Sequence, residues 1–438
     1  MAESYRLTAT EALKLIKSNE LTVQDYARSL LSRIESRDET VKAWAYLNED
    51  LVLEEARKLD EIPPDQRGPL HGVAIGVKDV IYTKDMPTEH NSPLYIKSQV
   101  PVDAASVAIL RAAGALIFGK TTTTEFASTV VGPPTCNPHD PTRTPGGSSS
   151  GSGAAVGDFQ VPIALGTQTG GSTIRPGSFN GVYALKPTWG AISREGQKIY
   201  SVILDTLGIY GRSVEDLEIL AEVLGVKDDV VSGFEGVSGA KFGVVKGPVW
   251  KKAGSGTIAA MDKAKTLLES HGAIVEEVEL PAEFDNMPDW HAKIMAGDGR
   301  VAFLSEYRVD KTRIHESLVG HVEGVKGYSR AEELAAFDGV AMLRPRIDEI
   351  AGRYAAILTP SVPDEAPVGI ESTGSAAFNG MWTALHVPVI NIPGFKGENA
   401  MPVGLSLVAP RYHDQHLLNV SKAVGAIFEK EGGWKSSL

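Results

Sequence analysis

Two stretches rich in serine and glycine, with a lysine upstream of them, hold residue types from which a hydrolytic site can be built. "TPGGSSSGSGAAVG" covers residues 144–157, and "LGTQTGGSTIRPGSFNGVYALKPT" covers residues 165–188. Each has a glycine pair directly before a serine, and these serines, Ser148 and Ser172, are 172 − 148 = 24 residues apart. Lys78 ends the apolar run "GVAIGVK". A lysine in so apolar a run is unusual unless its charge is removed or used.

The first stretch admits other interpretations. Its composition alone is typical of a flexible linker, but it lies inside an alternating α/β pattern and continues into an alanine-rich apolar segment. A phosphate or dinucleotide loop requires a preceding strand, and here a proline-rich segment precedes it. Residues 147–151 match the nucleophile elbow G-x-S-x-G literally. That elbow must also cap a strand and needs later Asp and His partners, and none of the ten histidines has a persuasive context.

Taken together, Lys78 and the two stretches resemble the amidase signature family of serine hydrolases. The resemblance extends over nearly the whole chain and is densest in "NPHDPTRTPGGSSSGSGAAVG…LGTQTGGSTIRP". It implies a layered α/β/α fold around a large mixed sheet, hydrolysis of amide bonds and a Ser-Ser-Lys triad. Motif by motif, it implies that Ser172 is the nucleophile, Ser148 the bridging serine and Lys78 the base. It also implies a cis peptide bond between Gly147 and Ser148.

The glycines of the second stretch have a separate task. A carbonyl oxygen under attack becomes an oxyanion and needs convergent N–H donors. Successive small residues let the backbone approach the substrate and turn its amides inward. We therefore assign the oxyanion hole to the main chain of Thr169, Gly170, Gly171 and Ser172.

The sequence departs from the family pattern at two places. Gln168 stands where many members have aspartate, and two residues rather than one separate Ser172 from Arg175. A role for Arg175 in binding a substrate carboxylate is therefore left open. We expect Thr124, Gln168 and Trp382 to line the substrate pocket.

The proposed base works only in its neutral form. A serine hydroxyl is a weak nucleophile at neutral pH and needs a base beside it. The reference pKa of lysine is about 10.4, and burial in a low dielectric lowers it. Asp79 would raise the pKa of Lys78 if it pointed inward, so we expect it to point elsewhere. Ser148 then relays a proton between Ser172 and Lys78, donating to one neighbour while accepting from the other.

Alternating helices and strands must position these residues. Thr8 with Glu11, and Thr22 with Asp25, predict two helix starts. Short apolar runs predict buried strands, and the segment 132–147, dense in proline and glycine, predicts a loop. We predict one large α/β domain with a central mixed sheet. Its parts are a helical part over 1–65, a signature core over 66–215, and the rest of the sheet with the substrate-pocket helices over 216–438.

Composition excludes several classes of partner. The formal net charge of −12 and the lack of a basic stripe argue against nucleic acid and anionic membranes. The single cysteine, Cys136, excludes an intrachain disulfide and fits a cytoplasmic location. The N-terminus does not resemble a signal peptide, and no apolar run is long enough to span a membrane. No residue cluster has metal-ligand spacing, so we expect neither metal nor cofactor.

Three functions remain open. The first is a stand-alone hydrolase of a small, largely neutral amide, with esters or carbamates as further substrates. The second, suggested by the resemblance, is a subunit that releases ammonia from glutamine for partner subunits. The third is a catalytically silent binding protein of the same fold, against which the intact Lys78, Ser148 and Ser172 argue. Relatives are often homodimers, so a homodimer is also expected.

Overall fold

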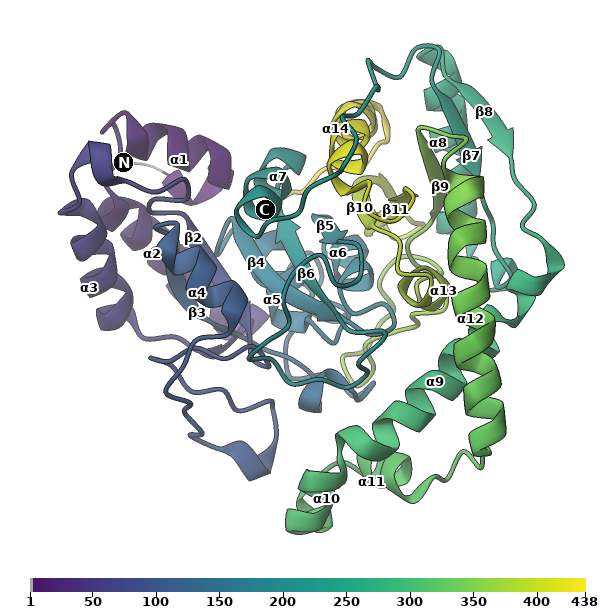
Figure 1. Cartoon of the computed structure of the whole chain (residues 1–438). Helices are drawn as coiled ribbons and strands as arrows, with labels where there is room; N and C mark the ends of the chain where they lie inside the picture. Colours follow the sequence, from purple (N-terminus) through teal and green to yellow (C-terminus); the bar gives the residue numbers. More distant parts are fainter. Residues whose placement is uncertain (1–2) are drawn as a thin grey trace.

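The structure is a computed structural model that describes residues 3–438, and these residues fold around one eleven-stranded mixed sheet (Figure 1). The strand order is β1-β3-β2-β4-β6-β5-β10-β11-β9-β7-β8. The strands are β1 (Trp44–Tyr46), β2 (Ala74–Lys78), β3 (Leu116–Thr121), β4 (Ile163–Gln168), β5 (Tyr183–Lys186), β6 (Thr206–Gly211), β7 (Lys241–Val244), β8 (Ile274–Glu277), β9 (Ala356–Pro360), β10 (Val389–Lys396) and β11 (Pro402–Val408). The single α/β domain predicted from the sequence is confirmed.

Helices lie on both faces of the sheet. They are α1 (Ala9–Lys17), α2 (Val23–Val41), α3 (Glu49–Asp60), α4 (Ala105–Ala112), α5 (Ser150–Gly157), α6 (Ile174–Phe179), α7 (Val214–Val223), α8 (Ser255–Ser270), α9 (Met287–Ala302), α10 (Leu304–Asp310), α11 (Glu316–Glu323), α12 (Arg330–Ala351), α13 (Gly380–Ala384) and α14 (Asp414–Glu431). None of the described helices combines the length and apolar character needed to cross a bilayer.

The side chains of β2 pack against helices on both faces of the sheet. Successive side chains of a strand point to opposite faces. Ile75 and Val77 join one core cluster with residues of α4, α7 and α14. Ala74 joins a second cluster with residues of α2, α3 and α5. Because both faces are buried, the strand has the continuous apolar sequence that predicts a buried strand.

The carboxyl ends of three neighbouring strands gather the site. β2 lies between β3 and β4 and is parallel to both, with Val77 opposite Lys120 on one side and Leu165 on the other. Lys78 ends β2, Thr121 ends β3 and Gln168 ends β4. In α/β sheets, ligands bind outside the carboxyl ends of parallel strands.

The predicted helix starts are found, with one difference. Thr8 and Glu11 form a complete capping box at α1. Thr22 caps α2 by accepting a hydrogen bond from the Asp25 N–H, but the structure shows no return bond from the Asp25 side chain. An aspartate is one methylene shorter than the glutamate that closes such a box.

Helices α9 to α12 extend away from the sheet at the end opposite to α1–α3 (Figure 1). The sequence predicts pocket helices in this part of the chain but does not locate them. A cluster of buried side chains packs the end of α9 and the start of α11 onto the loops around Phe126 and Tyr200, with Phe303, Ile314 and Leu318 as its other members. α9 also lies beside the loop that follows β4, since His291 Nε2 is 3.0 Å from the Thr169 carbonyl oxygen.

Candidate active site

Lys78 and Ser148 meet at the end of β2. The Lys78 side chain is fully buried, and its Nζ donates to Ser148 Oγ at 2.7 Å and to Thr167 Oγ1 at 2.7 Å. Thr167 belongs to β4, which runs parallel beside β2, so its hydroxyl reaches the strand-end lysine from the neighbouring strand. Sequence reasoning missed Thr167, because nothing in the sequence shows that these two strands are adjacent.

Asp79 points away from this lysine, as expected. Its Oδ1 accepts from Lys120 Nζ at 3.0 Å, and the Glu89 N–H also donates to its carboxylate. Lys120 lies on β3 and is fully buried, with a further bond of 2.6 Å to Thr88 Oγ1. The Asp79 charge is thus neutralised on the β3 side of the strand.

Burial has the largest effect on the pKa of Lys78. It holds the pKa of Lys78 well below its ordinary value. The nearby Asp205 carboxylate opposes this shift, and the Arg175 guanidinium adds to it. Burial also raises the pKa of Asp205 to about 6, against hydrogen bonds that favour its charged form. A lysine with so depressed a pKa has a neutral fraction that can accept a proton.

The first serine-rich stretch forms a buried loop that runs into α5. The peptide bond between Gly147 and Ser148 is cis. The Gly147 carbonyl accepts from Arg175 Nη2 at 2.6 Å, and the Ser148 carbonyl accepts from the Thr124 N–H at 3.3 Å. A side chain at Gly151 would meet the Ala43 carbonyl oxygen at 2.1 Å, so only glycine fits there. This stretch is therefore not a flexible linker.

The second stretch brings Ser172 to the first. The Ser149 N–H donates to the Ser172 carbonyl at 3.4 Å, and the Tyr210 hydroxyl donates to the same oxygen at 3.1 Å. Ser172 and Gly170 are partly exposed, whereas Ser148 and Lys78 are buried. Ser172 Oγ makes no hydrogen bond within residues 3–438. Lys78 Nζ thus donates to Ser148 Oγ, whereas no hydrogen bond joins Ser148 Oγ to Ser172 Oγ within residues 3–438.

Gln168 holds the shape of this second loop. Its Oε1 accepts from the N–H groups of Thr173 at 2.9 Å and Ile174 at 3.0 Å, where α6 begins. Its Nε2 donates to Thr383 Oγ1, which in turn donates to the Gly170 carbonyl. The Gln168 side chain is buried, and both ends of its amide bind the protein. The structure therefore gives Gln168 a part in holding the loop.

The N–H groups assigned to the oxyanion hole are not hydrogen-bonded within residues 3–438, unlike those of Thr173 and Ile174. Gln168 accepts from the N–H groups at the start of α6, whereas the N–H groups of Thr169, Gly170, Gly171 and Ser172 have no acceptor among the described residues. A side chain at Gly171 would meet Asn379 Oδ1 at 2.2 Å. An oxyanion requires N–H donors that no protein group has already taken up, and this loop provides them.

Two side chains that sequence reasoning missed hold Thr169. Asp205 Oδ1 accepts from Thr169 Oγ1 at 2.6 Å, and the Thr169 carbonyl lies 3.0 Å from His291 Nε2. A carbonyl can only accept, so His291 Nε2 carries the hydrogen. Burial lowers the pKa of His291, which keeps its ring neutral. Both residues are distant in sequence from Thr169, and no local motif marks either.

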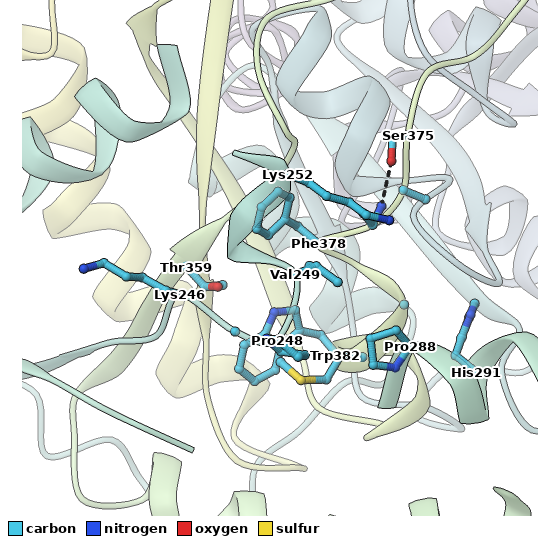
Figure 2. A pocket seen from close by; sticks show the side chains of 15 residues that line it. Lys246, Pro248, Val249, Lys252, Pro288, His291, Thr359, Ser375, Phe378 and Trp382 are labelled. Atoms are coloured by element: carbon cyan, nitrogen blue, oxygen red, sulfur yellow. Dashed lines mark hydrogen bonds between the residues drawn. The ribbon is translucent and has the colours of Figure 1, made fainter. Parts of the chain in front are cut away.

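The remaining candidates lie around the loops. Arg175 is buried, and its Nη1 and Nη2 donate to the carbonyls of Gly374 and Gly147, whereas its Nε has no partner within residues 3–438. Thr124 is buried beside Ser148, and its Oγ1 has no partner within residues 3–438. Trp382, on α13, is 2% exposed and lines a cavity of about 280 Å³ (Figure 2).

A metal site is not apparent in the described part of the chain. Within residues 3–438, no group of three or more His, Cys, Asp or Glu side chains is placed to hold a metal ion.

Comparison with known proteins gives consistent matches over almost the full length. The family model described as Amidase matches residues 25–418. A glutamyl-tRNA(Gln) amidotransferase subunit of Symbiobacterium thermophilum is 32% identical, over 95% of this chain and 96% of that protein. A crystal structure described as an amidase is 29% identical with a TM-score of 0.86, over 98% of this chain and 100% of that one. The crystal structure of a glutamyl-tRNA(Gln) amidotransferase subunit from Thermotoga maritima is 27% identical with a TM-score of 0.81, over 100% and 97%.

Proposed function

This chain belongs to the amidase family, and on that basis we propose that it hydrolyses a small amide through an acyl-enzyme on Ser172. The observation that carries the proposal is the buried Lys78, whose Nζ lies 2.7 Å from Ser148 Oγ. The substrate is neutral around its scissile bond, because Arg175, the cation beside these loops, is bound to main-chain carbonyls. Thr124, which is buried beside Ser148, contacts the substrate at the reacting centre.

The proposed reaction begins with attack by Ser172 Oγ on the amide carbonyl carbon. The Ser172 proton moves to Ser148 Oγ as the Ser148 proton moves to neutral Lys78. Negative charge develops on the carbonyl oxygen, where the main-chain N–H groups of Thr169, Gly170, Gly171 and Ser172 stabilise it. The same chain returns a proton to the leaving amine as the carbon–nitrogen bond breaks. Water then repeats the sequence on the acyl-enzyme and releases the acid.

Labelling with a phosphonate or a slow aryl ester tests the nucleophile. We expect one covalent adduct per chain, located on Ser172 by peptide mass mapping, and no adduct in Ser172→Ala. Ser172→Ala should lose on the order of 10³-fold or more in kcat, and adding Ser148→Ala should cost little further, because the residues act as a unit. An adduct on any other residue overturns the assignment.

The relatives favour a second candidate function. Proteins about 30% identical over nearly their whole length are named as one subunit of an amidotransferase. Under this alternative the same Ser172 chemistry releases ammonia from glutamine, and partner subunits use it. The purified single chain should then hydrolyse glutamine in preference to aryl and aliphatic amides, and partner subunits should increase that rate. Hydrolysis of simple amides by the isolated chain, with no preference for glutamine, favours the stand-alone amidase.

A further inference from the structure

A cavity lies beside residues 169–172, the oxyanion loop, and outside the reacting centre. It has a volume of about 280 Å³ and is lined by the segment 246–252 after β7, the start of α9, β9 and the segment 375–382 (Figure 2). Neither Lys78, Ser148 nor Ser172 lines it. Its volume is near the lower end of the range of about 300–1,000 Å³ for ligand pockets.

The charge of this cavity is opposite to that of the chain. The lining includes Lys246 and Lys252 but no aspartate or glutamate, in a chain of net charge −12. Lys246 lies 3.5 Å from Glu277, which compensates part of its charge. Lys252 makes no ion pair within residues 3–438. One uncompensated cation at the rim of a cavity without acids favours an anionic ligand.

The walls specify the rest of the ligand. Phe378, Trp382, Pro248 and Val249 contribute apolar surface to the lining of the cavity (Figure 2). The indole N–H of Trp382 donates to none of the described residues, and it remains accessible although the side chain as a whole is only 2% exposed. An apolar body flanked by a cation and a free N–H donor suits a compact organic acid.

We propose that this cavity binds a carboxylate with a compact aromatic or branched aliphatic body. Two lining residues connect it to the oxyanion loop. His291 donates to the Thr169 carbonyl at 3.0 Å, and Ala376 Cβ lies 2.9 Å from the position of a Cβ on Gly171. A ligand that moves either side chain acts on the loop that holds the oxyanion donors.

The carboxylate has two possible sources. It is either the far end of the amide substrate itself, which rests on the proposed function, or a separate acid that regulates the enzyme. Both sources place the same chemistry against Lys252, and kinetics separates them.

Binding is measured first, because it needs no turnover. The probe is 4-fluorobenzoate, titrated into the full-length chain and followed by ¹⁹F NMR. Lys252→Met keeps the aliphatic stem and removes the charge, and we expect it to weaken binding about two- to fivefold, the scale of one partly exposed charge pair. Lys251→Met is the matched control, since Lys251 is exposed and does not line the cavity. Trp382→Phe should also weaken binding, because the ring stays and the N–H is lost.

Two results overturn the proposal. One is equal affinity in Lys252→Met, Lys251→Met and the unmodified chain. The other is equal affinity of the unmodified chain for 4-fluorobenzyl alcohol, which has the same body without the charge. Either result leaves the cavity with no preference for carboxylates, whether or not the chain hydrolyses amides.

Kinetics then identifies the source. If the carboxylate belongs to the substrate, Lys252→Met raises KM for an amide with a distal carboxylate and leaves KM for its neutral analogue unchanged. If the carboxylate is a separate ligand, 4-fluorobenzoate changes kcat for a neutral amide, and Lys252→Met abolishes that change.

Discussion

Adding one methyl group at Gly171 should disable the oxyanion loop without unfolding the chain. A Cβ built on Gly171 lies 2.2 Å from Asn379 Oδ1, and real Cβ contacts are not found below 3.0 Å. The loop or the amide must therefore move by at least 3.0 − 2.2 = 0.8 Å. Asn379 resists because its Nδ2 donates to the Ser361 carbonyl at 2.9 Å in a buried site. We expect the loop to take up most of the displacement.

The neighbouring glycine provides the matched control. A Cβ at Gly170 has His291 Cε1 as its nearest neighbour at 3.6 Å, an ordinary contact, and neither glycine has a positive φ. A displacement of about 1 Å at a reacting centre can cost about 10²-fold in rate. Gly171→Ala should therefore lose about 10²-fold in kcat/KM, while Gly170→Ala stays close to the unmodified chain.

The assay is kcat/KM for an aryl amide, with near-ultraviolet circular dichroism and thermal melting as controls for folding. Adding Asn379→Ala to Gly171→Ala removes the clashing oxygen and should restore part of the activity. A folded Gly171→Ala variant with unchanged kcat/KM would refute the reasoning, and so would equal losses in the two alanine variants.

Three further predictions concern the groups around Lys78. The kcat/KM for an amide should rise with pH through one ionisation below the ordinary lysine pKa. Lys78→Arg should be inactive, because a guanidinium cannot accept a proton. Substantial amide turnover by Lys78→Arg would contradict the general-base role of Lys78. Thr167→Val removes one hydrogen-bond acceptor of Lys78 Nζ and so destabilises the ammonium form of Lys78. The rise in the pH–rate profile should therefore move to lower pH, and a profile that does not move would contradict this argument. Since burial raises the pKa of Asp205 to about 6, the folded state holds this proton more tightly than the unfolded state, and stability from this group falls as pH rises from about 4 through 6. Asp205→Asn should therefore gain melting temperature relative to the unmodified chain over that interval, and a constant difference between the two melting curves from pH 4 to 7 would show that Asp205 does not titrate there.

The fold class and the local character of the site segments follow from the sequence. The apolar run before Lys78 becomes a buried strand because a strand covered on both faces must be continuously apolar, and that property is visible in the residues. The segment 132–147 is a loop because its closely spaced prolines and glycines disfavour both a helix and a strand. The glycine pairs before Ser148 and Ser172 predict close approach of the backbone to neighbouring groups, because glycine has no side chain.

Which distant groups meet these residues depends on the packing of the whole chain. Thr167 reaches Lys78 because β4 pairs with β2, and strand pairing is set by the packing of the whole sheet. Asp205 and His291 hold Thr169 from a loop before β6 and from α9, and neither position has a local motif. The local sequence determines the backbone preference of a segment and the spacing of its apolar residues. Contacts between remote segments form only when the whole chain packs its apolar surface into the core. That is why the residues proposed to react were found in the sequence, whereas Thr167, Asp205 and His291, which hold Lys78 and Thr169, were not.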